Sequence, residues 1–187
     1  LSVVVISFVL QPRIFEWAVL KRKRLGHVPI SFLNFLASFS IFIVFLAGCV
    51  ILTLVGVIFL VPPYKRPVRR KVFYHKLVMY TCRLVIYLPA HIKKRIRGYS
   101  KELFRKPRVI ISNHQSHIDL PLLLMLHPKI IVLTQDWVWN NPFYGAIVKM
   151  CDYYPVSWGY EKTLDLLEKR VEEGYSILVF PEGTRAE

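Results

Sequence analysis

Two short polar motifs hold the residues best suited to chemistry. The first is SNHQSHID, residues 112–119, in which four residues separate His114 from Asp119. A histidine beside a carboxylate can act as a general base, because the carboxylate orients the imidazole and stabilises its protonated form. The second motif is FPEGTR, residues 180–185, in which Arg185 offers a planar guanidinium to a phosphate. Together the two motifs predict a base beside an anion-binding group.

The first motif also has interpretations without catalysis, and the sequence alone leaves them open. Asp119 is explained equally well as a helix cap, or as the acid of a capping box with Ser116, and His114 is then a polar loop residue. His117 is a competing base, to which we assign a surface role. A covalent nucleophile is not expected, because the chain has no GxSxG sequence and Cys151 has no activating basic neighbours.

The spacing of His114 and Asp119 restricts the local structure that can bring them together. On a continuous helix the two would lie roughly 140° apart, so they cannot share a helical face. We therefore expect a strand at 109–112 to deliver the histidine to a loop, and a helix to begin at or just before Asp119, with Pro121 in its first turn. The second motif follows a strand expected at 177–180, and ligands of open α/β sheets bind at the carboxyl ends of strands.

Beyond residue 106, short β-rich runs alternate with helical runs, which is typical of an α/β domain. Asn141 is the expected N-cap of one helix, and Gly174 the C-terminal stop of another. The remaining elements expected in this domain are strands at 130–134 and 153–156 and helices at 141–150 and 162–173.

Charge is divided unevenly along the chain. Residues 1–101 contain 17 Lys and Arg and one acidic residue, whereas residues 102–187 contain 9 Lys and Arg and 11 acidic residues. An apolar and basic front half is typical of a protein that meets anionic lipid, and we expect no nucleic-acid partner. The three cysteines form no CxxC pair, so neither a disulfide framework nor a metal site is expected.

Residues 31–61 are almost wholly apolar, and no charged residue occurs from 25 to 64. An unbroken helix of that length would measure about 46 Å, against a hydrocarbon core of about 30 Å. Basic residues flank both ends, which draws both ends toward the cytoplasm. We expect a re-entrant or strongly tilted membrane helix, and then a basic amphipathic helix at 67–88 in the headgroup layer, with the catalytic part on the cytoplasmic side.

These patterns divide the chain into four parts. They are the end of a preceding membrane segment with a basic linker (1–24), a hydrophobic membrane helix (25–64), a basic amphipathic helix with its connector (65–106), and an incomplete α/β domain (107–187). We expect the chain to be part of a longer protein, because it begins inside an apolar run and ends directly after the second motif.

The two motifs jointly resemble those of the glycerolipid acyltransferase family, typified by 1-acyl-sn-glycerol-3-phosphate acyltransferases. The resemblance covers residues 65–187 and implies an α/β fold, with a mixed sheet flanked by helices, truncated at its C-terminal end and preceded by membrane-associated helices. It implies His114 as the base and Asp119 as its partner. The residues that the resemblance assigns to the acceptor phosphate are Glu182, Gly183, Thr184 and Arg185.

The resemblance also implies the substrates. The acyl donor would be acyl-CoA or acyl carrier protein, the acceptor a lyso-lipid, and no cofactor is expected. Many members carry an arginine near the sequence YPVSW, residues 154–158, where this chain has none, and Lys162 is the candidate to replace it. Residues 1–17 weakly resemble the end of a transporter-like membrane domain.

The leading interpretation is therefore a membrane-bound O-acyltransferase that moves a fatty acyl group from a thioester to the hydroxyl of a lysophospholipid or related lipid. The alternative is a non-catalytic lipid-binding or exporter-associated membrane module. Loss of acyl transfer in a His114→Ala variant distinguishes the two.

Overall fold

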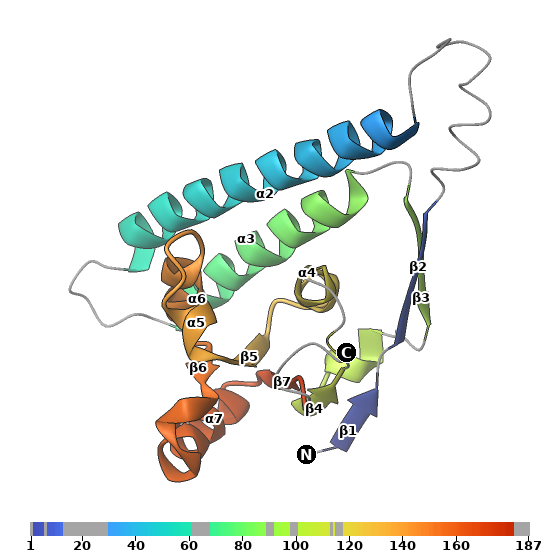
Figure 1. The fold of residues 1–187 in the computed structure, drawn as a ribbon. Coiled ribbons are helices and arrows are strands. Elements are labelled where there is room, and N and C mark those ends of the chain that lie inside the picture. The colour runs from blue at the N-terminus through green and yellow to red at the C-terminus, as the bar shows by residue number, and fades with distance from the viewer. Residues whose placement is uncertain are drawn as a thin grey trace.

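The structure is a computed structural model, and it describes residues 2–5, 7–12, 30–60, 68–88, 92–97, 101–112, 114 and 118–181. Figure 1 shows two long helices lying across one side of a small α/β domain. The strands are β1 (Ser2–Val5), β2 (Ser7–Pro12), β3 (Ile92–Arg97), β4 (Arg108–Ile111), β5 (Ile130–Thr134), β6 (Tyr154–Pro155) and β7 (Ser176–Val179). The helices are α2 (Ile30–Leu60), α3 (Val68–Tyr87), α4 (Asp119–Leu124), α5 (Asp136–Trp139), α6 (Gly145–Met150) and α7 (Tyr160–Glu172), with 3-10 turns η1 (Lys101–Phe104) and η2 (Val156–Trp158).

The main sheet has five strands in the order β1-β4-β7-β5-β6, and each neighbouring pair is parallel. This confirms the predicted α/β class. A mixed sheet was predicted, but the described strands of the main sheet are all parallel. The antiparallel pair among the described strands, β2 with β3, forms a separate ribbon. Parallel strands are buried on both faces, so they consist of continuous apolar runs such as Ile130 to Leu133.

The expected strands of the domain are present within one or two residues of their predicted bounds. The central strand β7 lies between β4 and β5, and its Leu178 is fully buried beside Ile110 and Val132. Helices α3 and α4 lie on one side of this sheet and α7 on the other (Figure 1). The core is therefore formed where the apolar strands meet one face of each helix.

Two segments within the part predicted to end a membrane segment are strands. Residues Ser2–Val5 form β1, which pairs with β4 in parallel, and Ser7–Pro12 form β2, which pairs with β3. β-branched residues favour strands, and the edge of β4 offers unpaired backbone groups to Val3, Val4 and Val5. Part of the expected connector, Ile92–Arg97, is likewise a strand. Residues 13–29 lie outside the described residues.

The predicted apolar helix is present as α2, continuous over 31 residues. Its side toward the domain packs against α3 and α6, because Gly48 and Gly56 leave room for close approach. A Cβ at Gly56 would lie 2.2 Å from Sδ of Met150 and 3.0 Å from the Tyr74 ring. The Tyr74 hydroxyl donates a hydrogen bond to the carbonyl of Leu52, 3.1 Å away. These contacts attach α2 to the domain along one face.

The expected amphipathic helix is also present, as α3, and a buried ionic cluster attaches it to the domain. Lys71 Nζ lies 2.5 Å from Oδ2 of Asp152, and Arg170 approaches the same oxygen at 3.7 Å. Arg170 also pairs with Glu173 at 2.5 Å and donates to the Tyr154 hydroxyl at 3.3 Å. Since each charge has a partner of opposite sign, the cluster holds α3 against α7 and the turn after α6.

The region between β5 and β6 is more broken than predicted. Asn141 accepts hydrogen bonds from the backbone N–H groups of Phe143 and Tyr144, so it caps a turn, but its predicted role as a helix N-cap is wrong, because Tyr144 is the N-cap residue. The helix itself begins only at Gly145, and the sequence analysis missed α5 over Asp136–Trp139. Four residues are too few to show helical periodicity in a sequence, which explains the omission.

Candidate active site

The loop after β4 brings His114 to the start of α4. Helix α4 begins at Asp119, and its first turn contains Pro121, as predicted. Nδ1 of His114 lies 3.5 Å from Oδ2 of Asp119, and the two side chains are 24% and 21% exposed. The separation exceeds that of an ideal hydrogen bond, which is typical of catalytic pairs before substrate binds. The pair is therefore assembled and half-buried, with access to solvent.

The imidazole of His114 directs its Nδ1 atom at the carboxylate of Asp119. Nδ1 of His114 is buried and has no hydrogen-bond partner among the described residues, so Asp119 is the nearest described group that can accept from it. A proton held at Nδ1 leaves the lone pair of Nε2 available. This arrangement suits a base that takes a proton through Nε2.

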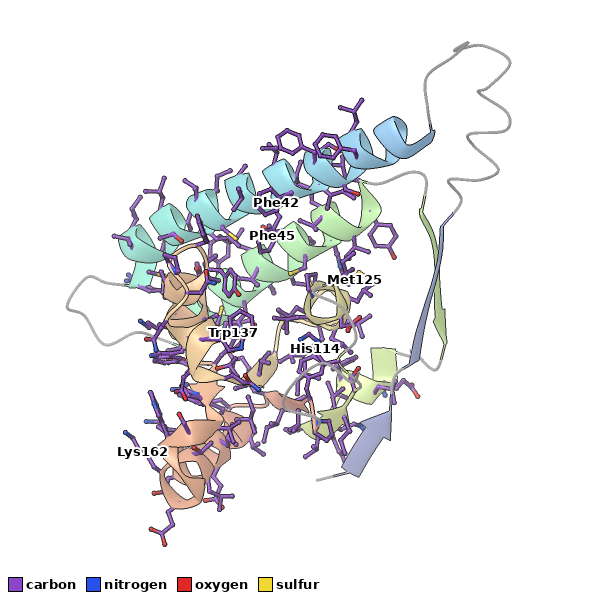
Figure 2. The ribbon with its side chains drawn as sticks, in the orientation of Figure 1. Phe42, Phe45, His114, Met125, Trp137 and Lys162 are labelled. Atoms are coloured by element: carbon purple, nitrogen blue, oxygen red, sulfur yellow. The ribbon has the colours of Figure 1, made fainter. Side chains whose placement is uncertain are left out.

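Phe180 connects the second motif to the first. Its ring lies against the imidazole of His114, with centroids 4.7 Å apart and planes inclined by 37°. The cause is the sheet order, because β4 and β7 are adjacent and parallel, with Ile111 beside Val179. The backbone N–H of Ser112 continues this pairing by donating to the Val179 carbonyl at 3.2 Å. Figure 2 shows His114 in this region, beneath α4.

The second motif was predicted to matter through its polar residues, and the contact made by its first residue, Phe180, was not predicted. Phe180 shapes the surroundings of the base through its ring. The available signal was its position at the end of the strand expected at 177–180; the adjacency of that strand to β4 came only from the structure.

Several predicted residues lie outside the described part of the chain. They include the competing base and the capping-box serine, His117 and Ser116, and the residues predicted to hold the acceptor phosphate, Glu182, Gly183, Thr184 and Arg185. Their assignment stays a prediction. What the structure describes of the second motif is Phe180 and Pro181.

Lys162, the candidate to replace the family's arginine, lies away from the base. Its Nζ is 4.5 Å from the centroid of the Trp158 ring. Figure 2 shows Lys162 on α7, far from His114 across the view. A cation–π contact with Trp158 therefore accounts for its position.

Cys151 is unsuited to nucleophilic attack, in agreement with the sequence analysis. Its side chain is fully buried, and burial raises the pKa of its thiol well above the ordinary value. A thiol in that state is almost entirely protonated at neutral pH, and the protonated form is a poor nucleophile.

Comparisons with known proteins identify the family of this chain. The model of the acyltransferase family matches residues 90–187, which include both motifs. The chain is also 30% identical over 125 residues, 64% of its length, to the chloroplastic 1-acyl-sn-glycerol-3-phosphate acyltransferase of Arabidopsis thaliana. It covers 34% of that relative. No solved structure matches the chain. With the motif spacing, the sheet edge and the family model in agreement, the chain belongs to the glycerolipid acyltransferase family.

Proposed function

We propose that this protein transfers a fatty acyl group from a thioester to the hydroxyl of a lysophospholipid or related lipid, with His114 as the general base. The observation that carries the proposal is the 3.5 Å approach of His114 and Asp119 at the sheet edge where the second motif begins. Family membership supports lipid acyl transfer in general.

The chemistry follows from the orientation of the imidazole. With Nδ1 facing Asp119, Nε2 of His114 takes the proton from the attacking hydroxyl as its oxygen forms a bond to the thioester carbonyl carbon. Collapse of the tetrahedral intermediate breaks the carbon–sulfur bond. The imidazolium then returns the proton to the departing thiolate, so that an ester and a free thiol leave the site. Asp119 stabilises the imidazolium between these steps.

The residues that follow Phe180 supply the acceptor site in this proposal. Charge-assisted hydrogen bonds from a guanidinium suit a lipid phosphate, and a glycine permits backbone N–H groups to approach it. The proposed acceptor-binding residues are Glu182, Gly183, Thr184 and Arg185. Their position directly after a strand adjacent to β4 supports the assignment.

An apolar surface on α2 supports attachment to a membrane. Within the described residues, the segment Ser38–Leu60 is the one helical stretch long and apolar enough to cross a bilayer. The exposed large apolar side chains of α2 are Phe35, Leu36, Phe39, Phe42, Ile43, Val50, Ile51, Leu54, Val57, Ile58 and Phe59. A patch of this extent on a water-exposed surface is unusual and indicates contact with lipid.

The contacts of α2 favour one orientation in the membrane. Cys49, Leu52 and Leu60 are buried against the domain, so lipid cannot surround that side of the helix. The neighbouring α3 exposes Phe73, Tyr80 and Leu84, together with basic residues, on a surface suited to headgroups. We propose that α2 lies in one leaflet through its outer face, with the domain on the cytoplasmic side. Cysteines placed at Ser31 and Val61 should then be labelled from the same side, whereas labelling from opposite sides contradicts this topology.

His114→Ala in the full-length protein tests the catalytic proposal. We expect acyl transfer to fall at least about a thousandfold, because a base and its proton relay are lost together. Flotation with anionic vesicles should be unchanged, since α2 and α3 are intact. Labelled acyl-CoA and acyl carrier protein conjugates, offered with a panel of lyso-lipids, identify the donor and acceptor. Turnover retained in this variant contradicts the proposal and favours a lipid-binding module.

A further inference from the structure

Arg83 connects the outer helix α3 to the far end of α4. Its Nε donates a hydrogen bond to the main-chain carbonyl of Met125, at 2.9 Å. Met125 is the residue that ends α4, and its side chain is buried. Carbonyls at the C-terminal end of a helix lack intrahelical partners, and a cation there also interacts favourably with the helix dipole. Figure 2 shows Met125 at the edge of α4, beneath α3.

A fixed C-terminal end of α4 also fixes its N-terminal end. Met125 lies six positions after Asp119, about 9 Å at the usual rise of an α-helix, and so short a helix moves as a rigid unit. Leu122 and Leu123 hold its apolar side in the core, at 1% and 0% exposure. They resist lateral movement, whereas a directional bond from Arg83 also resists rotation and sliding along the axis.

The guanidinium of Arg83 also lies near an exposed aromatic ring of its own helix, α3. The central carbon of the Arg83 guanidinium lies 5.5 Å from the centroid of the Tyr80 ring, which is 57% exposed. The guanidinium thus has the Tyr80 ring and the Met125 carbonyl as neighbours. Since Tyr80 belongs to the surface that we assign to lipid headgroups, one side chain joins that surface to the helix carrying Asp119.

We propose that Arg83 is a positioning residue for acyl transfer, which holds α4 so that the Asp119 carboxylate faces His114. This inference rests on the proposed function. Arg83 contacts neither substrate nor the reacting atoms in this account, and it acts through α4. Its loss should therefore lower kcat and leave KM unchanged.

Arg83→Met tests the inference, because it keeps the aliphatic stem and removes the donor. We expect kcat to fall about tenfold at constant KM, since a small displacement of a catalytic group costs up to about a hundredfold. Arg83→Lys retains a donor able to reach a carbonyl and should recover kcat to within roughly threefold of the wild type. The matched control is Arg105→Met, whose side chain is 78% exposed and pairs with Glu102 on the surface. Unfolding midpoints are measured for each variant.

The outcomes separate this inference from the proposed function. In one outcome, His114→Ala abolishes activity while Arg83→Met and Arg105→Met have the same kcat. That result contradicts the positioning role of Arg83 and leaves the proposed function intact. A rise in KM at constant kcat also contradicts it. Full turnover in His114→Ala contradicts the proposed function itself. Should Arg83→Met fail to fold, Arg83→Leu takes its place, because it also lacks the donor to the Met125 carbonyl, and a kcat equal to that of Arg105→Met overturns the inference.

Discussion

The ring of Phe180 lies against the imidazole of His114, with centroids 4.7 Å apart. The two residues belong to different motifs, and they meet because β4 and β7 are adjacent parallel strands. The contact places the first residue of the second motif beside the predicted base. It also provides the apolar wall that limits the orientations of the imidazole.

Phe180→Ala should therefore weaken catalysis without affecting membrane attachment. Loss of the ring contact frees the imidazole to rotate away from Asp119, and we expect kcat to fall about tenfold. The matched control is Phe104→Ala, which removes a similar contact of an aromatic ring with a histidine, His127, at 4.9 Å. Initial rates with saturating donor and acceptor measure the effect. Equal kcat values in the two variants would show that Phe180 has no part in orienting the base.

Asp119→Asn should lower kcat by about 10² to 10⁴, because an amide stabilises the imidazolium poorly and favours the wrong tautomer. The structural cost should be small, since Asn also suits the start of a helix. Asp165→Asn, on the exposed side of α7, removes the same charge and serves as the control. Steady-state kinetics and unfolding midpoints are compared. A wild-type kcat in Asp119→Asn would show that the aspartate has no part in catalysis.

Gly56→Val should loosen α2 from the domain. A Cβ at this position meets the side chain of Met150 and lies 3.0 Å from the Tyr74 ring, so these side chains or the helices that carry them must shift. We expect the free energy of unfolding to fall by about 1–3 kcal/mol, as for other overpacked interiors. Ala47→Val adds a similar volume at an exposed position of the same helix and should change little. Denaturant unfolding in a fixed detergent measures both, and equal midpoints would contradict the contact of α2 with α6.

The pH dependence of stability should contain a contribution from His75. Burial lowers its pKa from the ordinary 6.5 to about 4, while nearby Asp152 acts in the opposite direction. Between about pH 6.5 and 4 the unfolded chain binds a proton that the folded chain does not. Stability from this group is therefore complete above pH 6.5 and is lost as the pH falls toward 4, by about 3 kcal/mol in total.

His75→Phe removes this titration and keeps an aromatic ring beside Tyr153 and Tyr175, whose centroids lie 6.1 and 5.2 Å from that of His75. We expect the variant to lose less stability than the wild type between pH 7 and pH 4.5. Urea unfolding at the two pH values measures the difference. Parallel losses in the two proteins would show that His75 does not titrate in this range.

Much of the local structure was predictable because it depends on short-range patterns. The apolar runs at 130–134 and 177–180 predicted strands, and the uncharged segment at 31–61 predicted a long helix, now seen as α2. The start of α4 at Asp119 followed from the spacing of the histidine and the aspartate, which no single helix could satisfy. In each case, backbone geometry and hydrophobic periodicity were sufficient to predict the element.

Other features depended on partners distant in the chain. Val3 to Val5 were interpreted as part of a membrane segment, and only the open edge of β4 makes them a strand. The same reasoning applies to Ile92–Arg97, a strand that exists through its pairing with Ser7–Pro12. A run of polar or apolar residues in the sequence does not reveal which edge strand it will pair with.

By itself, the sequence determined the chemistry: a histidine, a carboxylate and a second motif of the acyltransferase type, with an apolar and basic segment ahead of them. Only the tertiary structure decided that β7 lies beside β4, which brings Phe180 to His114, and that Arg83 of α3 reaches the end of α4. Residue types and spacing encode what a side chain can do, but strand order and helix contacts depend on the burial of surfaces far apart in the chain, and these decide what each side chain meets.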